Sequence, residues 1–147
     1  MILNQRQLQI SRKKLADLLS YRDTVVQRES PESQLELESI DEVLTGLEHE
    51  INEYESLFNS HPNQIEIDSL SDLPLAVIKA RIASGLTHQH LASRLQLTES
   101  AIQRYEQQSY RGVSFDRLRE IINAIGIPML VRHDPLKDAQ VSTSERQ

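Results

Sequence analysis

Polar side chains of several chemical types recur at helical spacing just after Thr98. If residues 99–107 form a helix that turns Ile102 and Tyr105 inward, the positions on its opposite face all carry polar groups. Amide and guanidinium groups can make paired hydrogen bonds to base edges, and a carboxylate can accept from the amino group of cytosine. The pattern therefore predicts a base-reading surface. Its members are Glu99, Ser100, Gln103 and Arg104, with Gln107 beside them.

Two short helices, over residues 88–95 and 99–107, must hold that surface in place. Each follows a threonine, Thr87 or Thr98, whose hydroxyl can cap the first turn. The small Ala92 suits a close crossing of the two helices. Such a helix-turn-helix pair can lay its second helix in the major groove of DNA while the first crosses the backbone. The expected inward positions are Leu91, Ala92, Leu95, Ile102 and Tyr105.

Further short elements surround this pair. A helix over 73–84 ends at Gly85, and another over 115–124 begins after Ser114 and ends at Gly126. Glycine is common at such ends because it tolerates the left-handed conformation. The C-terminal half is therefore predicted to be a cluster of four or five short helices.

The segment 61–72 is expected to join two parts of the chain. Its turn residues, His61-Pro62-Asn63, precede the three residues 65–67, which alternate as in a short strand. The residues "MLVRH" at 129–133 could form an edge strand. From residue 134 onward the composition is polar, which predicts disorder.

Residues 31–59 carry the most regular pattern of the chain. Apolar residues repeat there at alternating spacings of three and four, the heptad seam of a coiled-coil helix. A helix over 4–28 precedes it, so we expect an antiparallel helical hairpin, with room for a further partner helix. The seam is a candidate interface for a second copy or another protein. It consists of Leu37, Ile40, Leu44, Leu47, Ile51, Tyr54 and Phe58.

Charge is distributed unevenly along the 147 residues, whose net charge is −6. Residues 1–72 hold six Lys or Arg against 15 Asp or Glu, whereas residues 73–133 hold eight against four. Within the first part, residues 29–59 contain ten acidic residues and no Lys or Arg. A basic first helix beside an acidic second helix favours the hairpin. The acidic run is either its solvated face or a surface for a basic partner.

Several protein classes are excluded by what the sequence lacks. Without cysteine there is no disulfide framework, thiol catalysis or thiolate zinc site. No apolar run approaches the roughly 18 residues that span a bilayer, and no signal segment is recognisable, so a cytoplasmic location is expected. His88 and His90 are two residues apart, which is poor spacing for metal ligands on a helix. Since no nucleophile site or phosphate loop is recognisable either, we expect neither an enzyme nor a cofactor.

The stretches "ARIASGLTHQHLASRLQLTESAIQRYEQ" and "SFDRLREIINAIGI" make residues 73–127 resemble the Cro/C1-type (XRE family) helix-turn-helix domain of phage repressors and bacterial antitoxins. The longer "IQRYEQQSYRGVSFDRLREII", with the N-terminal "NQRQLQIS", resembles antitoxin-like regulators of the HigA sort. Gln96 and Gln108 stand where that family often has glycine, so each must adopt positive φ or reshape its turn. His90 replaces a typical glutamate, so the capping box is missing.

The resemblance also assigns roles to single residues. In that family the residue after the first threonine cap clamps a phosphate, which implies this role for His88, and the exposed residues of the second helix read bases. Glu106 matches a glutamate that is structural in the family. Two arginines are further candidates for phosphate contacts, with plain solvent exposure as the alternative. The full set of expected phosphate contacts is His88, Arg94, Thr98 and Arg111.

These observations predict an all-α protein with a helical hairpin over 1–60, a linker over 61–72, a helix-turn-helix domain over 73–133 and a disordered tail over 134–147. The expected function is sequence-specific binding of double-stranded operator DNA by a homodimer, for transcriptional repression. The resemblance implies the antitoxin of a type II toxin–antitoxin pair that autoregulates its operon, with a cognate toxin as partner. Two alternatives stay open: a stand-alone XRE-type repressor, and an interaction module whose acidic hairpin binds a basic protein.

Overall fold

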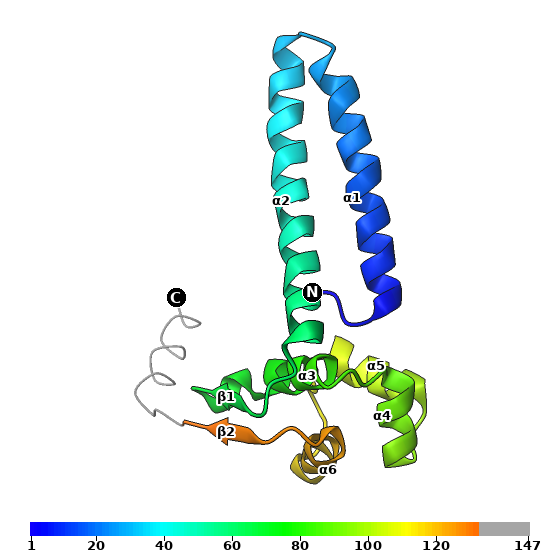
Figure 1. Cartoon of the computed structure of the whole chain (residues 1–147), viewed down its shortest axis with the longest axis vertical. Coiled ribbons are helices and arrows are strands. Elements are labelled where there is room, and N and C mark those ends of the chain that lie inside the picture. The colour runs from blue at the N-terminus through cyan, green and yellow to red at the C-terminus, as the bar shows by residue number, and fades with distance from the viewer. Residues whose placement is uncertain (133–147) are drawn as a thin grey trace. The chain divides into compact units, whose positions relative to one another are not determined.

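The computed structural model describes residues 1–132, which form two compact units, Met1–Leu57 and a second that begins at Phe58. Nearly all regular structure in both units is helical (Figure 1), which confirms the predicted all-α class. The tail predicted over 134–147 lies outside the described residues. Among the described helices, none combines the length and the apolar character that crossing a bilayer requires.

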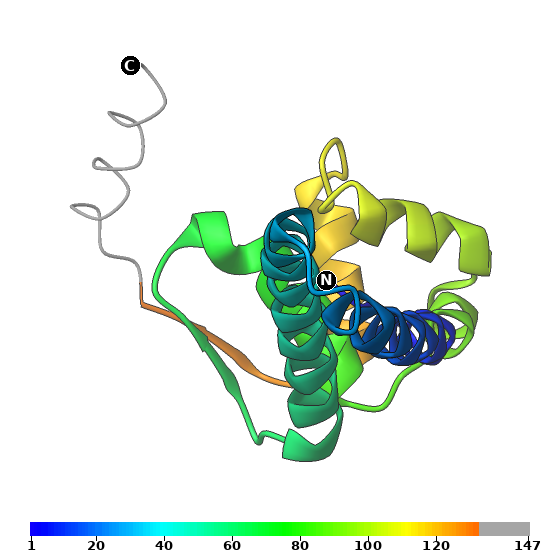
Figure 2. The same cartoon turned by 90° about the horizontal axis from the view of Figure 1, so that it is seen from above.

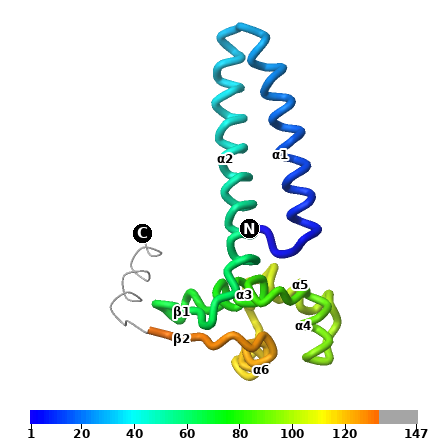
Figure 3. The backbone as a smooth tube through the Cα atoms, in the orientation of Figure 1, coloured from blue at the N-terminus to red at the C-terminus, as the bar shows by residue number. Residues whose placement is uncertain are grey.

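The first unit is an antiparallel hairpin of α1 (Gln5–Val26) and most of α2 (Pro31–Ser60), whose paths can be followed in Figure 3. Asn4 caps α1, because its side chain accepts a hydrogen bond at 2.8 Å from the backbone N–H of the third helical residue. Ser30 accepts in the same way at the start of α2, at 3.2 Å. Pro31 takes the first helical position, where its missing N–H leaves no bond unmade.

Apolar side chains of the two helices meet along the hairpin. Val25 of α1 forms a buried cluster with Ile40 and Leu44 of α2. Further along the predicted seam, Ile51 and Tyr54 are only 7% and 5% exposed. The prediction that these four α2 residues face a second molecule is therefore wrong, because they are already buried within the chain. Of the other seam residues, Leu37 and Leu47 are half-buried and Phe58 is exposed.

Ion pairs cross the hairpin from α1 to α2. Arg22 Nε lies 2.5 Å from Asp41 Oδ1, and Arg12 Nη2 lies 2.5 Å from Glu55 Oε1. The hydrogen bond from Arg22 lowers the pKa of Asp41 below its usual value. Exposed pairs of this kind contribute little to stability, but they match the basic face of one helix to the acidic face of the other.

The second unit packs four helices around one apolar core. A short 3-10 turn, η1, directly precedes α3. The elements are η1 (Leu70–Asp72), α3 (Leu73–Ala83), α4 (His88–Leu95), α5 (Glu99–Gln107) and α6 (Phe115–Ile125). Each helix contributes at least one side chain without solvent exposure: Val77, Leu91, Ile102 and Ile121. The predicted bounds of α4 and α5 agree with the structure at both ends.

Two short strands close the second unit. β1 (Ile65–Ile67) and β2 (Met129–Val131) pair in parallel, side by side in Figure 2. The N–H of Arg132 donates to the carbonyl of Ile67 at 2.8 Å. Both strands were predicted, but their pairing was not. The segment predicted as a linker, 61–72, supplies β1 and η1 to the second unit.

Candidate nucleic-acid interface

Helices α4 and α5 both start on threonine caps. The hydroxyl of Thr87 accepts a hydrogen bond from the N–H of His90 at 3.1 Å, and that of Thr98 accepts from the N–H of Ala101 at 3.2 Å. Each bond satisfies one of the amides that a helix leaves unpaired at its start. A glutamate at the position of His90 is therefore not needed to begin α4.

A single left-handed residue sets the turn between the two helices. Gln96 has φ 55° and ψ 39° and ends α4, and the N–H of Leu97 donates to the carbonyl of Ala92 at 2.9 Å. Gln96, the first of the two positions where the family often has glycine, thus adopts positive φ. At the second, Gln108 keeps φ −91°, and the left-handed residues are the next two, Ser109 and Tyr110. The turn after α5 is therefore reshaped, and Gln108 itself does not adopt positive φ.

The outward face of α5 carries the predicted base-reading residues. Glu99, Ser100 and Arg104 are exposed, and Gln103 is half-buried. The Gln103 side-chain amide donates to the Glu99 carboxylate at 3.2 Å, one turn away. The Arg104 guanidinium lies 6.0 Å from the centre of the Tyr105 ring, which orients it by a cation–π contact. These groups offer donors and acceptors on one side of a short helix.

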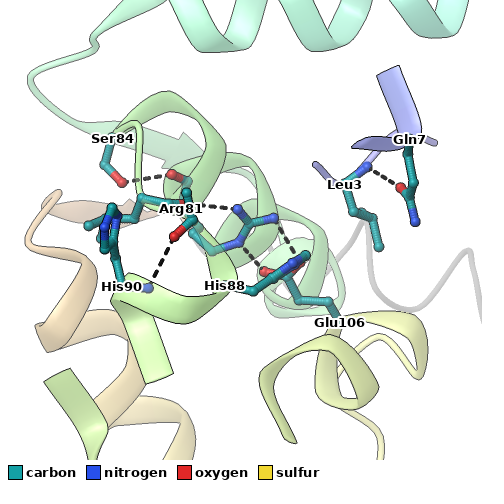
Figure 4. A network of polar contacts seen from close by, with 9 residues as sticks. Leu3, Gln7, Arg81, Ser84, His88, His90 and Glu106 are labelled. Atoms are coloured by element: carbon teal, nitrogen blue, oxygen red, sulfur yellow. Dashed lines mark hydrogen bonds and ion pairs between the residues drawn. The ribbon is translucent and has the colours of Figure 1, made fainter. Parts of the chain in front are cut away.

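Three charged or polar side chains meet beneath that face, shown in Figure 4. Arg81 of α3 donates to both carboxylate oxygens of Glu106 on α5, from Nε at 2.5 Å and from Nη2 at 2.9 Å. The ring Nε2 of His88, the first residue of α4, lies 2.6 Å from the same carboxylate. All three residues are at most 3% exposed. This buried cluster joins α3, α4 and α5 at one point.

The cluster holds Glu106 as a carboxylate. Burial alone would raise the pKa of Glu106, but hydrogen bonds from His88 and Arg81, with the charge of Arg81, lower it below its ordinary value. Because a carboxylate only accepts hydrogen bonds, His88 must carry its proton on Nε2 in this contact. Burial, followed by the nearby Glu106 charge, raises the pKa of Tyr110. Its hydroxyl is buried without a hydrogen-bond partner among the described residues.

The predicted phosphate contacts occupy different environments. His88 is buried against Glu106, so the prediction that its side chain clamps a phosphate is wrong: ring and carboxylate satisfy each other inside the domain. Arg94 is exposed but donates from Nη1 to the carbonyl of Ala124, near the end of α6, at 2.7 Å. Thr98 is exposed at the start of α5, and Arg111 is exposed in the loop before α6.

Sequence reasoning missed the role of Arg81 altogether. A signal was present, because Arg81 falls in the run "LPLAVIKARIA". A charged residue among so many apolar ones on a short helix needs a buried partner of opposite sign. Glu106 was recognised as structural, but the sequence does not indicate which cation faces it.

The segment 77–131 matches a protein-family model described as helix-turn-helix. It is a helix-turn-helix domain. The match begins within α3 and ends at the last residue of β2, so it includes the α4–α5 pair and covers a little over a third of the chain. In such a domain α5, the second helix of the pair, takes the position of the recognition helix. The match supports a DNA-binding transcriptional regulator of the XRE type. No curated protein and no solved structure matches the chain.

Proposed function

We propose that this chain is a sequence-specific transcriptional repressor that acts as a homodimer on operator DNA. The observation that supports this most directly is the polar outward face of α5, held on a helix whose inner side is fixed by Ile102 and Glu106. The buried cluster ties α5 to α3 and α4, so its outward side chains approach DNA on a firm support.

Different side chains of this surface contact the bases and the phosphates of the duplex. Gln103 and Arg104 read base edges through paired hydrogen bonds, while Glu99 and Ser100 contact bases at the start of the helix. Thr98 and Arg111 contact phosphates, and the remaining N–H groups of Arg94 can do the same. Phosphate contacts set the register of α5 in the groove, and base contacts give the sequence preference.

A dimer is needed because one such domain covers only a short stretch of DNA. Two copies read two half-sites about one helical turn apart, and the symmetry of the operator then follows that of the protein. Specific complexes also bury more surface than a single small module offers.

A mobility-shift titration tests the base-reading assignment, using DNA from upstream of the protein's own gene and a scrambled duplex as competitor. Gln103→Ala and Arg104→Ala should each weaken operator binding by about 1–3 kcal/mol, or roughly 5- to 150-fold, with little change on scrambled DNA. Arg6→Ala, which removes an exposed arginine from α1, is the matched control and should bind as the native chain does. Unchanged affinity in both α5 variants would reject the recognition-helix assignment.

Salt dependence tests the phosphate contacts separately. Operator affinity should fall linearly with the logarithm of salt concentration, because each neutralised phosphate releases counterions. Arg111→Ala should weaken binding to all sequences alike and reduce that slope by about one. A slope equal to that of the native chain would remove Arg111 from the phosphate set.

We further propose that the repressor is the antitoxin of a type II toxin–antitoxin pair and represses its own operon. Apart from the family resemblance, the support is the acidic character of α2, which offers a basic toxin a complementary surface. Co-expression with the product of the adjacent gene tests this. The two proteins should co-purify, and Glu38→Lys with Glu42→Lys, at exposed α2 positions, should break the complex without loss of DNA binding.

Two other functions predict different outcomes of the same experiments. A stand-alone repressor would bind its operator but no product of a neighbouring gene. A pure interaction module would bind a basic protein through α2 and would show no preference for operator over scrambled DNA.

A further inference from the structure

An apolar groove of about 560 Å³ crosses the second unit between η1, α6 and β2. Its walls include Leu73, Leu118, Ile122 and Met129, which are all half-buried. None of its lining residues comes from α4 or α5. The groove is therefore separate from the proposed DNA-reading face, and a molecule bound in it leaves α5 free.

One of the residues that line this groove has a large, exposed aromatic side chain. Phe115, the first residue of α6, is 74% exposed and is among the residues that line it. Leu70 and Val131, from η1 and β2, are also 54% and 38% exposed. A patch that carries both a projecting ring and an apolar hollow can complement itself. This is what a two-fold symmetric interface requires, since both subunits use the same surface.

The charges around the groove are balanced. On α6, Arg119 lines the groove and pairs with Asp116 at 3.4 Å. At the strands, Arg132 pairs with Glu66 at 3.1 Å. Two copies brought together at this rim can therefore place opposite charges face to face.

The exposed surface of α2 is the competing candidate for self-association, and it has the opposite character. Leu35 and Val43 are 69% and 45% exposed there. They lie on a helix with many acidic residues and no lysine or arginine. Two copies of that surface would bring like charges together, which disfavours the contact. The charge pattern thus assigns α2 to a basic partner and leaves the groove for a second copy.

We propose that the groove between η1, α6 and β2 is the interface through which two copies of this chain associate, with Phe115 of each copy seated in the groove of the other. The inference rests on the homodimer of the proposed function and specifies its surface. It also places self-association in the helix-turn-helix unit and not at the heptad seam of the hairpin, which was a candidate interface for a second copy or another protein. Each α5 then keeps its outward face open in the dimer.

Sedimentation equilibrium of the full chain tests the interface. Phe115→Glu should raise the dimer dissociation constant at least 100-fold, because it would bury an unpaired carboxylate in the apolar groove. Phe115→Leu should keep the dimer. Leu35→Glu, which adds the same charge to the exposed face of α2, is the matched control and should dimerise as the native chain does. Since both native side chains are well exposed, neither change should lower the melting temperature of the monomer.

DNA binding gives a second readout. Phe115→Glu should weaken binding to a duplex with both half-sites at least tenfold, while binding to a single half-site changes less than twofold. The interface is refuted if Phe115→Glu still sediments as a dimer, if Leu35→Glu alone dissociates it, or if the native chain is a monomer at micromolar concentration. A native dimer that Phe115→Glu dissociates but that shows no operator preference would support the interface and reject the repressor function.

Discussion

Replacing Glu106 by glutamine should destabilise the helix-turn-helix domain more than any equally small change at its surface. The carboxylate accepts from Arg81 at 2.5 and 2.9 Å and from His88 at 2.6 Å, all in a site almost without solvent. The glutamine side chain has the same size, but its amide nitrogen would face another donor, and the Arg81 charge would stay buried without a counter-charge. Breaking a buried pair in this way costs about 3–5 kcal/mol, against the roughly 5–15 kcal/mol that holds a domain folded.

Urea denaturation measures this cost, followed through amide NMR signals of α3 and α5 so that the hairpin does not contribute. We expect the free energy of unfolding to fall by about 3 kcal/mol, a change of roughly 150-fold in the unfolding constant. Glu120→Gln is the matched control, because Glu120 is 54% exposed and pairs with Arg117 at the surface. It should cost at most about 0.5 kcal/mol. Equal effects of the two variants would refute the view that the buried cluster holds the domain together.

Three further predictions concern the pH dependence of the buried cluster, the turns after α4 and α5, and the hairpin. Because the folded pKa of Glu106 is lowered below 4.5, its stabilisation is complete above about pH 4.5 and lost as the pH falls through the folded pKa, so acid unfolding of α5 should be less steep in Glu106→Gln. Gln96→Gly should raise the free energy of unfolding by about 0.5–1 kcal/mol, whereas Gln108→Gly, at φ −91°, should lower it, which thermal denaturation can compare. In the hairpin, Leu44→Ala should cost about 2–5 kcal/mol and Leu35→Ala almost nothing, as judged by circular dichroism during urea titration.

Local sequence signals were sufficient to predict where most of the helices begin and end. Thr87 and Thr98 mark the starts of α4 and α5, and Gly126 marks the end of α6. Caps and left-handed stops act within one helical turn, so they can be read from a few adjacent residues. The same holds for the outward face of α5, whose polar members follow directly from helical periodicity.

Contacts between distant residues could not be predicted in the same way. The parallel pairing of residues 65–67 with 129–131 leaves no local trace, because strands of three residues carry almost no register information. The burial of His88 depends on Arg81 and Glu106, which come from two other helices. The expectation for His88 came only from the family resemblance, which carries no information on these two partners. Histidine there meets the buried carboxylate instead.

The parallel pairing of β1 and β2 has a consequence for the order in which the two units fold during synthesis. The hairpin is built from contacts between neighbouring helices and can form once residue 60 has left the ribosome, whereas the strand pair that closes the second unit must wait for residue 131. At the roughly 5–20 residues per second of synthesis, that is an interval of about 4–14 seconds. A nascent chain can therefore complete its acidic hairpin seconds before its helix-turn-helix unit is closed by the strand pair.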